Sequence, residues 1–188
     1  MLMEAKTQDA VLLFEDAVHQ LHTTHTGNAI QKVGKANTKR LESNTGRDRL
    51  TILGAVDPIS LQFSSVTTTG MCNKDLCKLL IDQIVLDHRT AIESQKHIYV
   101  VLDNARYQKA YEVQEYAKTH GVTLVFLPPY CPHLNLIERL WKWLKKKVRN
   151  RYFPTFQEFS DTIHTLLKNL PTYHDELRTY LNPKFRII

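Results

Sequence analysis

Cysteine, glycine and proline are scarce in this sequence, and long apolar runs are missing. The three cysteines, Cys72, Cys77 and Cys131, are an odd number without a repeated short spacing. This pattern excludes a disulfide framework or a zinc knuckle and favours reduced thiols in a cytosolic protein. Six glycines and seven prolines are too few for a low-complexity linker. No signal peptide is visible and no apolar stretch approaches a membrane span, so we expect no membrane partner.

The rest of the composition is that of an ordinary globular protein with a basic surplus. The chain has 188 residues, 43% hydrophobic and 23% charged, which fits one domain or one domain with a small appendage. There are 25 lysine and arginine residues against 19 aspartate and glutamate residues, so the formal net charge is +6. A surplus of this size points to a polyanionic partner.

The hydrophobic pattern predicts strands in the first third of the chain. Residues 11–14 form an apolar strand that runs into Glu15 and Asp16, and residues 18–26 fit its hairpin partner. Residues 50–56 and 61–67 fit a second hairpin around Asp57-Pro58. We expect this hairpin at the centre of a sheet, because its first strand has no polar face.

The pattern then alternates between helix and strand. The expected elements are a helix capped by Asn73, a strand at 97–102, a helix at 105–120, a strand at 122–127, a helix at 134–148 and a helix after a Thr155/Glu158 capping box. This order predicts an α/β protein with a mixed sheet flanked by helices. We expect residues 1–152 to form the main domain and residues 153–188 a C-terminal helical extension packed on it.

Three acids stand where α/β folds place ligands, at strand ends and helix starts. Asp16 follows the first strand run, Asp103 follows the strand at 97–102, and Glu138 lies near the start of its helix. Three carboxylates brought together repel one another and therefore need a hard divalent cation such as Mg²⁺.

Each acid alone also has a simpler interpretation. Asp103 fits the N-cap of the following helix, and Glu138 fits a surface ion pair with Lys142 at i,i+4. Asp16 fits a turn, and the neighbouring Glu15 competes for the role of ligand. Spacing alone leaves these alternatives open.

Two motifs around the acids carry a family resemblance. They are residues 100–105, read VVLDNA, and residues 127–141, read LPPYCPHLNLIERLW. Between Asp103 and Glu138 lie 34 residues. In these motifs, and in residues 12–16, read LLFED, the chain resembles the catalytic domain of DDE transposases of the Tc/mariner superfamily, in its bacterial insertion-sequence branch. The resemblance covers roughly residues 11 to 148.

The resemblance implies a ribonuclease-H-like fold and Mg²⁺-dependent (or Mn²⁺-dependent) DNA strand cleavage and strand transfer. It implies that Asp16, Asp103 and Glu138 are the catalytic residues and the ligands of two metal ions. Asn104 and Asn135 also match motif positions, and we expect Asn104 to cap a helix beginning near Ala105 and Asn135 to bond the loop backbone.

Partners and location follow from the same resemblance. The implied partners are DNA, as element ends and as target DNA, and a second copy of the chain in an active homodimer. The implied location is the bacterial cytoplasm, with association to the nucleoid on DNA.

The chain departs from the family pattern at several places. Ala17 stands where members often carry Glu, Gln108 where they often carry His, and Leu136 where they often carry Pro. Relatives usually begin with helix-turn-helix segments, whereas about ten residues precede the first predicted strand. The chain therefore fits a catalytic half that works with a separate N-terminal DNA-binding chain or frame. It also fits a decayed remnant that only binds DNA or a partner chain, and a related nuclease that hydrolyses DNA without joining it.

A dense basic segment follows Glu138 on the same helix. Lys142, Lys145 and Arg149 recur on the face that carries Glu138, and Lys146 lies beside them. A DNA phosphate that approaches the acids would meet these charges, so we predict that the four residues bind DNA. The alternative is an ordinary solvated helix face.

Overall fold

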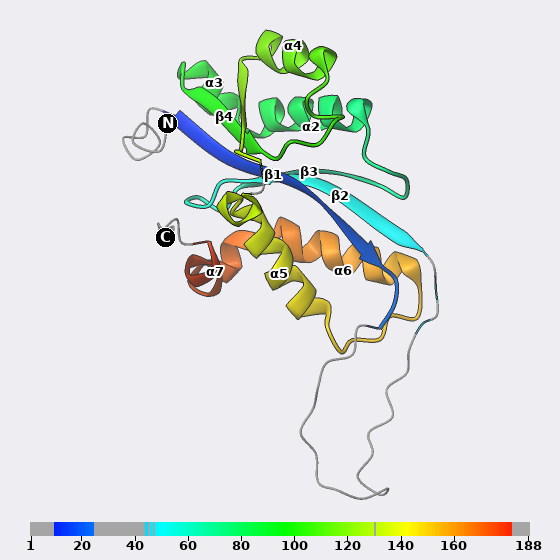
Figure 1. Cartoon of the computed structure of the whole chain (residues 1–188). Helices are drawn as coiled ribbons and strands as arrows, with labels where there is room; N and C mark the ends of the chain where they lie inside the picture. The colour runs from blue at the N-terminus through cyan, green and yellow to red at the C-terminus, as the bar shows by residue number, and fades with distance from the viewer. Residues whose placement is uncertain (1–9, 25–43, 45, 47, 130, 182–188) are drawn as a thin grey trace, which may run out of the picture.

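A five-stranded mixed sheet forms the centre of the molecule. The computed structural model describes residues 10–24, 44, 46, 48–129 and 131–181. The strands are β1 (Ala10–Leu21), β2 (Arg49–Val56), β3 (Phe63–Thr68), β4 (His97–Leu102) and β5 (Val122–Phe126), in the order β3-β2-β1-β4-β5. β1 pairs antiparallel with β2 and parallel with β4, β3 is antiparallel to β2, and β5 is parallel to β4. The predicted mixed sheet is confirmed (Figure 1).

β1 differs from its prediction, because it is one continuous strand rather than the first arm of a hairpin. Residues 10–14 pair with β4, and residues 14–21 pair with β2. The two acids in its middle continue the strand because Glu15 lies opposite Ala55 and Asp16 opposite Gly54, which are small partners. Residues 25 and 26 of the expected hairpin partner lie outside the described residues.

Helices cover both faces of the sheet, as Figure 1 shows. On one face lie α2 (Lys74–Asp87), α3 (Arg89–Glu93) and α4 (Tyr111–Thr119); on the other lie α5 (Ile137–Val148), α6 (Phe156–Lys168) and α7 (His174–Tyr180). Side chains of β1 alternate between the two cores. Leu13 belongs to the core under α2 and α4, whereas Leu12, Phe14 and Val18 belong to the core with α5 and α6.

The predicted starts of α2 and α6 are confirmed, whereas the predicted start of α4 is wrong. Asn73 accepts from the Leu76 N–H (2.9 Å) at the start of α2, and Thr155 accepts from the Glu158 N–H (3.2 Å) at the start of α6, both as predicted. α4 begins at Tyr111 rather than near Ala105, because residues 105–109 form a separate turn in which the carbonyl of Ala105 accepts from two backbone N–H groups.

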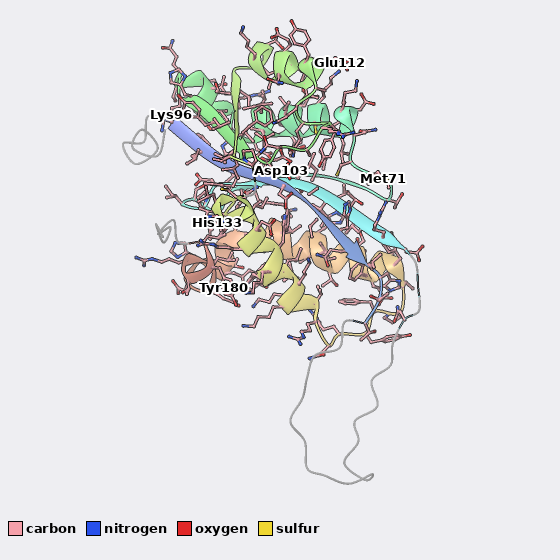
Figure 2. The ribbon with its side chains drawn as sticks, viewed as in Figure 1. Met71, Lys96, Asp103, Glu112, His133 and Tyr180 are labelled. Atoms are coloured by element: carbon pink, nitrogen blue, oxygen red, sulfur yellow. The ribbon has the colours of Figure 1, made fainter. Side chains whose placement is uncertain are left out.

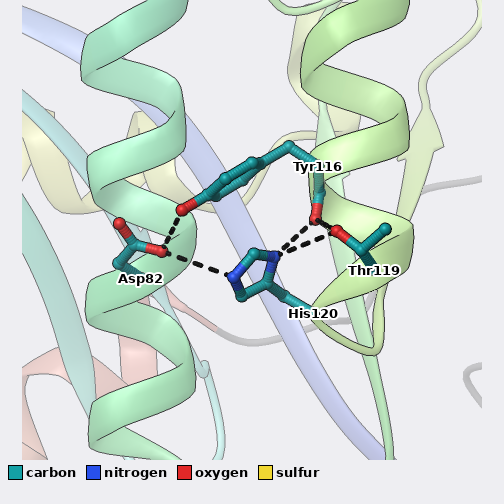
Figure 3. Close-up of polar contacts among 4 residues, drawn as sticks. All are labelled: Asp82, Tyr116, Thr119 and His120. Atoms are coloured by element: carbon teal, nitrogen blue, oxygen red, sulfur yellow. Dashed lines mark hydrogen bonds and ion pairs between the residues drawn. The ribbon is translucent and has the colours of Figure 1, made fainter.

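The outer helices α2 and α4 are joined by polar side chains. The Tyr116 hydroxyl donates to Asp82 Oδ1 (2.7 Å), and His120 Nε2 lies 3.9 Å from the same oxygen (Figure 3). Thr119 Oγ1 lies 3.2 Å from His120 Nδ1. These exposed contacts hold two helices together on the face away from α5. Within the described residues, no helix is long and apolar enough to cross a membrane.

Candidate carboxylate site

The first two predicted acids lie on neighbouring parallel strands. β1 and β4 are parallel, and Phe14 of β1 is paired with Val101 of β4. Asp16 lies two residues after Phe14, and Asp103 lies two residues after Val101. Asp16 lies on the same face of β1 as Phe14 and Val18, which face α5. Asp103 comes directly after β4 and is exposed; Figure 2 labels it where the end of β4 meets β1. The sheet therefore brings these two acid-bearing segments side by side.

The third acid arrives on α5, which packs against β1. Glu138 is the second residue of the helix and is exposed, while Leu140 and Trp141 are buried in the core with Phe14. A β-carbon on Gly54, the partner of Asp16, would lie 3.2 Å from the Trp141 ring, so the helix sits directly over this part of the sheet. The Phe63 ring would lie nearer still, at 2.5 Å, so the missing side chain of Gly54 leaves room for both rings.

The electrostatics of Asp16 show that the three acids act on one another. Its pKa is raised to about 7, first by burial and then by the charges of Glu138 and Asp103. Its hydrogen bond with the backbone N–H of Ala17 opposes this rise, as does the nearby Trp141 indole. A cation bound beside Asp16 would favour its ionised form.

The acids do not form a compact metal cage by themselves. Across the described part of the chain, no three His, Cys, Asp or Glu side chains come close enough to hold an ion together. Asp103 Oδ1 instead accepts from the Ala105 N–H (3.0 Å) in the turn before α4, and Asp103 does not cap that helix, which begins at Tyr111. The donors are nevertheless all carboxylate oxygens, which are the ligands that suit Mg²⁺ or Mn²⁺.

Glu15, the rival of Asp16, lies on the opposite face of the sheet. Its side chain is 4% exposed and borders a small cavity among Leu53, Cys77 and Leu80. Its pKa is raised to about 8, chiefly by burial and then by the charge of Asp16, whereas a hydrogen bond from Gln108 opposes the rise. Strand alternation therefore separates the two adjacent acids, and Asp16 is the one on the side of Glu138.

The predicted DNA-binding residues line one groove. Lys142, Lys145, Lys146 and Arg149 border a groove of about 500 Å³, together with His19, Gln20, Leu21 and Tyr180. Lys146 Nζ donates to the Tyr180 hydroxyl (3.4 Å), and Figure 2 shows Tyr180 on α7 beside α5. The neighbouring Lys147 has a different surrounding, because its Nζ lies 2.6 Å from Glu176 and over the ring of Tyr173.

Both predicted asparagine contacts turn out to be long-range rather than local. Asn104 Nδ2 donates to the carbonyl of Leu127 at the end of β5 (2.7 Å) and does not cap a helix at Ala105. Asn135 Nδ2 donates to the carbonyl of Glu15 on β1 (2.8 Å), not to the loop backbone. Gln108, which was noted only as a departure, donates to the Glu15 carboxyl. No local sequence signal could reveal these contacts, since their partners lie 23, 120 and 93 residues away.

The comparisons with known proteins bear on the family and the fold. A sequence model of the family described as DDE superfamily endonuclease matches residues 11–160. A search among curated proteins gave no significant match.

Several solved structures share the fold. The pre-cleavage Mos1 transpososome superimposes with a TM-score of 0.69 at 12% identity, over 98% of this chain and 60% of that chain. The Mos1 mariner paired end complex with Mn gives a TM-score of 0.67 at 13% identity, over 98% and 61%. The catalytic domain of Mos1 mariner transposase gives 0.67 at 9% identity, over 97% and 82%.

These structural matches establish the ribonuclease-H-like fold, as predicted. The chain spans about 60% of the length of the Mos1 chains in the two complexes. Identity this low supports the fold alone, so the role of each residue has to be argued from this chain.

Proposed function

Since this chain belongs to the DDE superfamily of endonucleases, we propose that it is the catalytic domain of a transposase of the Tc/mariner superfamily, in its bacterial insertion-sequence branch. The proposed activity is divalent-metal-dependent cleavage of DNA strands at element ends and transfer of those ends to target DNA. The observation that supports the proposal is the placement of the three acid-bearing segments: Asp16 and Asp103 each lie two residues after a pair of residues matched between β1 and β4, and α5, which carries Glu138, packs against β1.

We propose Asp16, Asp103 and Glu138 as the metal ligands and catalytic residues, with Mg²⁺ or Mn²⁺ as two bound ions. Support comes from their oxygen donors and from the charges of Glu138 and Asp103, which act on Asp16 in addition to its burial. When bound, such ions lower the pKa of an attacking water and stabilise the leaving 3′ oxygen of a phosphodiester. The carboxylates themselves would hold the ions from the middle of β1, the end of β4 and the start of α5, which are rigid supports.

The groove beside α5 supplies the surface for DNA. Lys142 and Lys145 follow Glu138 by one and two helical turns, and Arg149 by three, so the cations extend about 16 Å from the acid along the helix axis. A DNA strand that enters the acidic site would therefore keep its phosphates beside positive charge. Phosphate contacts of this kind position DNA without reading its sequence.

Further parts of the proposal rest on the family resemblance. We propose a homodimer as the active form, with element recognition supplied by a helix-turn-helix segment in this or a separate chain. We also propose that residues 1–152 form the catalytic unit and residues 153–188 its helical extension. The proposed location is the bacterial cytoplasm, on the nucleoid when DNA is bound.

The decisive experiment measures nicking and joining on a pre-cleaved element end with and without Mg²⁺ or Mn²⁺. Asp103→Asn should lower the rate by about 10²-fold or more, because an amide cannot replace the charge of the ligand. Asp161→Asn is the matched control, since Asp161 is an exposed acid on α6, and it should keep the full rate. Full activity of Asp103→Asn would refute the assignment.

Two alternatives predict different outcomes in the same experiment. A decayed remnant would bind DNA in a salt-sensitive way without any metal-dependent cleavage. Ala17 and Gln108, the departures from the family pattern, favour this alternative. A nuclease that does not join would cleave the substrate but leave a target oligonucleotide unmodified, so the joining step separates the two enzymes.

A further inference from the structure

A buried carboxyl–amide pair lies directly behind the proposed site. Gln108 Nε2 lies 3.1 Å from both carboxyl oxygens of Glu15, and the two side chains are 1% and 4% exposed. The wall around them is apolar, with Leu80, Val100 and Leu102 among its members. Apolar side chains of similar volume would fill such a space without the desolvation that a buried carboxyl requires. Packing alone therefore does not explain the pair.

The other end of the Gln108 amide reaches the segment that carries Asp103. Gln108 Oε1 accepts from the Ala105 N–H (3.2 Å), and the same N–H donates to Asp103 Oδ1 (3.0 Å). One backbone group is thus shared between Gln108 and the carboxylate of Asp103. Through this amide, the position of Asp103 is tied to Glu15, the residue that precedes Asp16 on β1.

The backbone of Glu15 holds the third acid-bearing segment. Asn135 is 3% exposed, and its Nδ2 donates to the Glu15 carbonyl (2.8 Å). The Asn135 carbonyl in turn accepts from the Glu138 N–H (3.3 Å), in the turn that leads into α5. Glu15 therefore contacts, by side chain or backbone, the segments of both Asp103 and Glu138, and it adjoins Asp16.

We propose that Glu15, Gln108 and Asn135 form a positioning unit that sets the relative placement of Asp16, Asp103 and Glu138 for binding two divalent ions. The inference rests on the proposed function and deepens it, because it assigns the geometry of the metal site to residues that do not touch the metal. Planar amides have fixed donor and acceptor directions, so each of these contacts constrains orientation as well as distance. Gln108 then serves as a working part of this chain's site rather than a sign of decay.

The test measures the affinity of the full chain for Mn²⁺ by isothermal titration calorimetry, with folding monitored by thermal unfolding. Gln108→Leu removes both amide contacts and should weaken Mn²⁺ binding by about 10- to 100-fold, the range for residues that support metal ligands. Gln62→Leu is the control, because it removes another long-range amide contact, from Gln62 Nε2 to the Asp87 carbonyl (2.7 Å). The control should leave Mn²⁺ affinity unchanged.

If Gln108→Leu does not fold, a single variant and a compensating double variant test the same contact. Gln108→Glu places two carboxyls face to face and should weaken Mn²⁺ binding, whereas Glu15→Gln combined with Gln108→Glu restores a carboxyl–amide pair in reverse. The double variant should recover affinity to within about threefold of the wild type, since the coupling between contacting residues is what a double-mutant cycle measures.

The outcomes separate this inference from the proposed function. Folded Gln108 variants that bind Mn²⁺ as tightly as a metal-binding, DNA-cleaving wild type would overturn the positioning unit and leave the function standing. A double variant that folds and binds no better than Gln108→Glu would overturn it too. A wild type that binds no Mn²⁺ would overturn the proposed function and, with it, this inference.

Discussion

At the scale of single residues, the buried polar side chains decide how this protein responds to its surroundings. Glu15 and Asp16 are neighbours in sequence, yet strand alternation sends one into the core under α2 and α4 and the other towards α5. Both have a raised pKa, to about 8 for Glu15 and about 7 for Asp16, because burial disfavours the charged carboxylate. His88 is a buried base, and burial lowers its pKa because it disfavours the charged imidazolium.

We predict that His88 makes the fold sensitive to acid. The side chain is 5% exposed and its Nε2 lacks a hydrogen-bond partner. Burial lowers its pKa below the ordinary value of 6.5, although the charges of Asp57 and Asp87 oppose this. The unfolded chain therefore takes up the proton first, so the contribution of neutral His88 to stability is full above pH 6.5 and is lost as the pH falls through the lowered pKa.

The measurement is the free energy of unfolding in denaturant between about pH 7.5 and about pH 5. The raised pKa values of Glu15 and Asp16 act in the opposite direction over this interval, and they do so in both proteins. Lowering the pH should therefore raise the stability of His88→Leu relative to that of the wild type, because the residue that must be protonated is gone. His174→Leu is the control, since His174 is exposed on α7, and it should follow the wild-type profile. Equal acid sensitivity of His88→Leu and the wild type would contradict the prediction.

At the scale of elements, α5 combines three roles on one short helix. Its first turn carries Glu138, and its apolar stripe of Ile137, Leu140, Trp141, Leu144 and Val148 is buried. Trp143 lies off the stripe but is also buried, because Tyr173 packs against it with ring centroids 5.1 Å apart. The C-terminal elements thus cover a second side of α5 and leave its basic side open.

The N-cap of α6 allows a test of what stabilises the C-terminal helices that pack on α5. Thr155 Oγ1 accepts from the Glu158 N–H, and Phe159 and Ile163 of the same helix are buried in the core with α5. Thr155→Ala should lower the free energy of unfolding by about 1 kcal/mol, because one backbone donor loses its partner.

Chemical denaturation measures this change. Thr155→Ser keeps the hydroxyl and should retain most of the stability, which makes it the matched variant. The cap lies in the segment after α5, so Mn²⁺ affinity should stay at the wild-type value in both variants. An alanine variant as stable as the serine variant would show that the cap contributes nothing.

At the scale of the whole molecule, charge is distributed so that one of the three acids, Glu138, and the four basic residues of the groove follow one another along α5. The chain carries a formal charge of +6, and the groove gathers Lys142, Lys145, Lys146 and Arg149 beside the end of β1. Contacts from these residues to phosphates would release counterions, which makes DNA affinity depend on salt.

We predict that the triple variant Lys142→Gln, Lys145→Gln, Arg149→Gln weakens DNA binding and its salt dependence together. Each lost phosphate contact should reduce the slope of log K against log salt by about 0.9, or about 2.7 for three contacts, between about 50 and 200 mM salt. Fluorescence anisotropy with a labelled duplex measures this slope. The loss should be similar for unrelated DNA sequences, because phosphates carry no sequence information.

A variant with the same change in net charge serves as the control. Lys78→Gln, Arg89→Gln and Lys118→Gln remove three cations from α2, α3 and α4 on the opposite face of the sheet. This control should keep a slope close to that of the wild type. Equal losses in the two variants would mean that net charge, rather than the groove, governs binding.

The sequence by itself determined the class of fold, most element positions and the choice of candidate acids. Periodicity located β4, α2, α5 and α6 to within a few residues, because burial of one face leaves a local pattern. It missed the continuity of β1 and the late start of α4, because pairing opposite Ala55 and Gly54, and the turn around Ala105, depend on other segments. The three acids came from motifs, and their roles remain a prediction.

Only the tertiary structure decided which side of the sheet each polar residue occupies and what it contacts. Strand parity separates Asp16 from Glu15, and chain folding brings Gln108 and Asn135 to Glu15 across 93 and 120 residues. Such contacts leave no periodic trace, because a single hydrogen bond between distant segments constrains two positions and nothing between them. The physical reason is that local patterns record burial, whereas the placement of a charge depends on all the elements that meet around it.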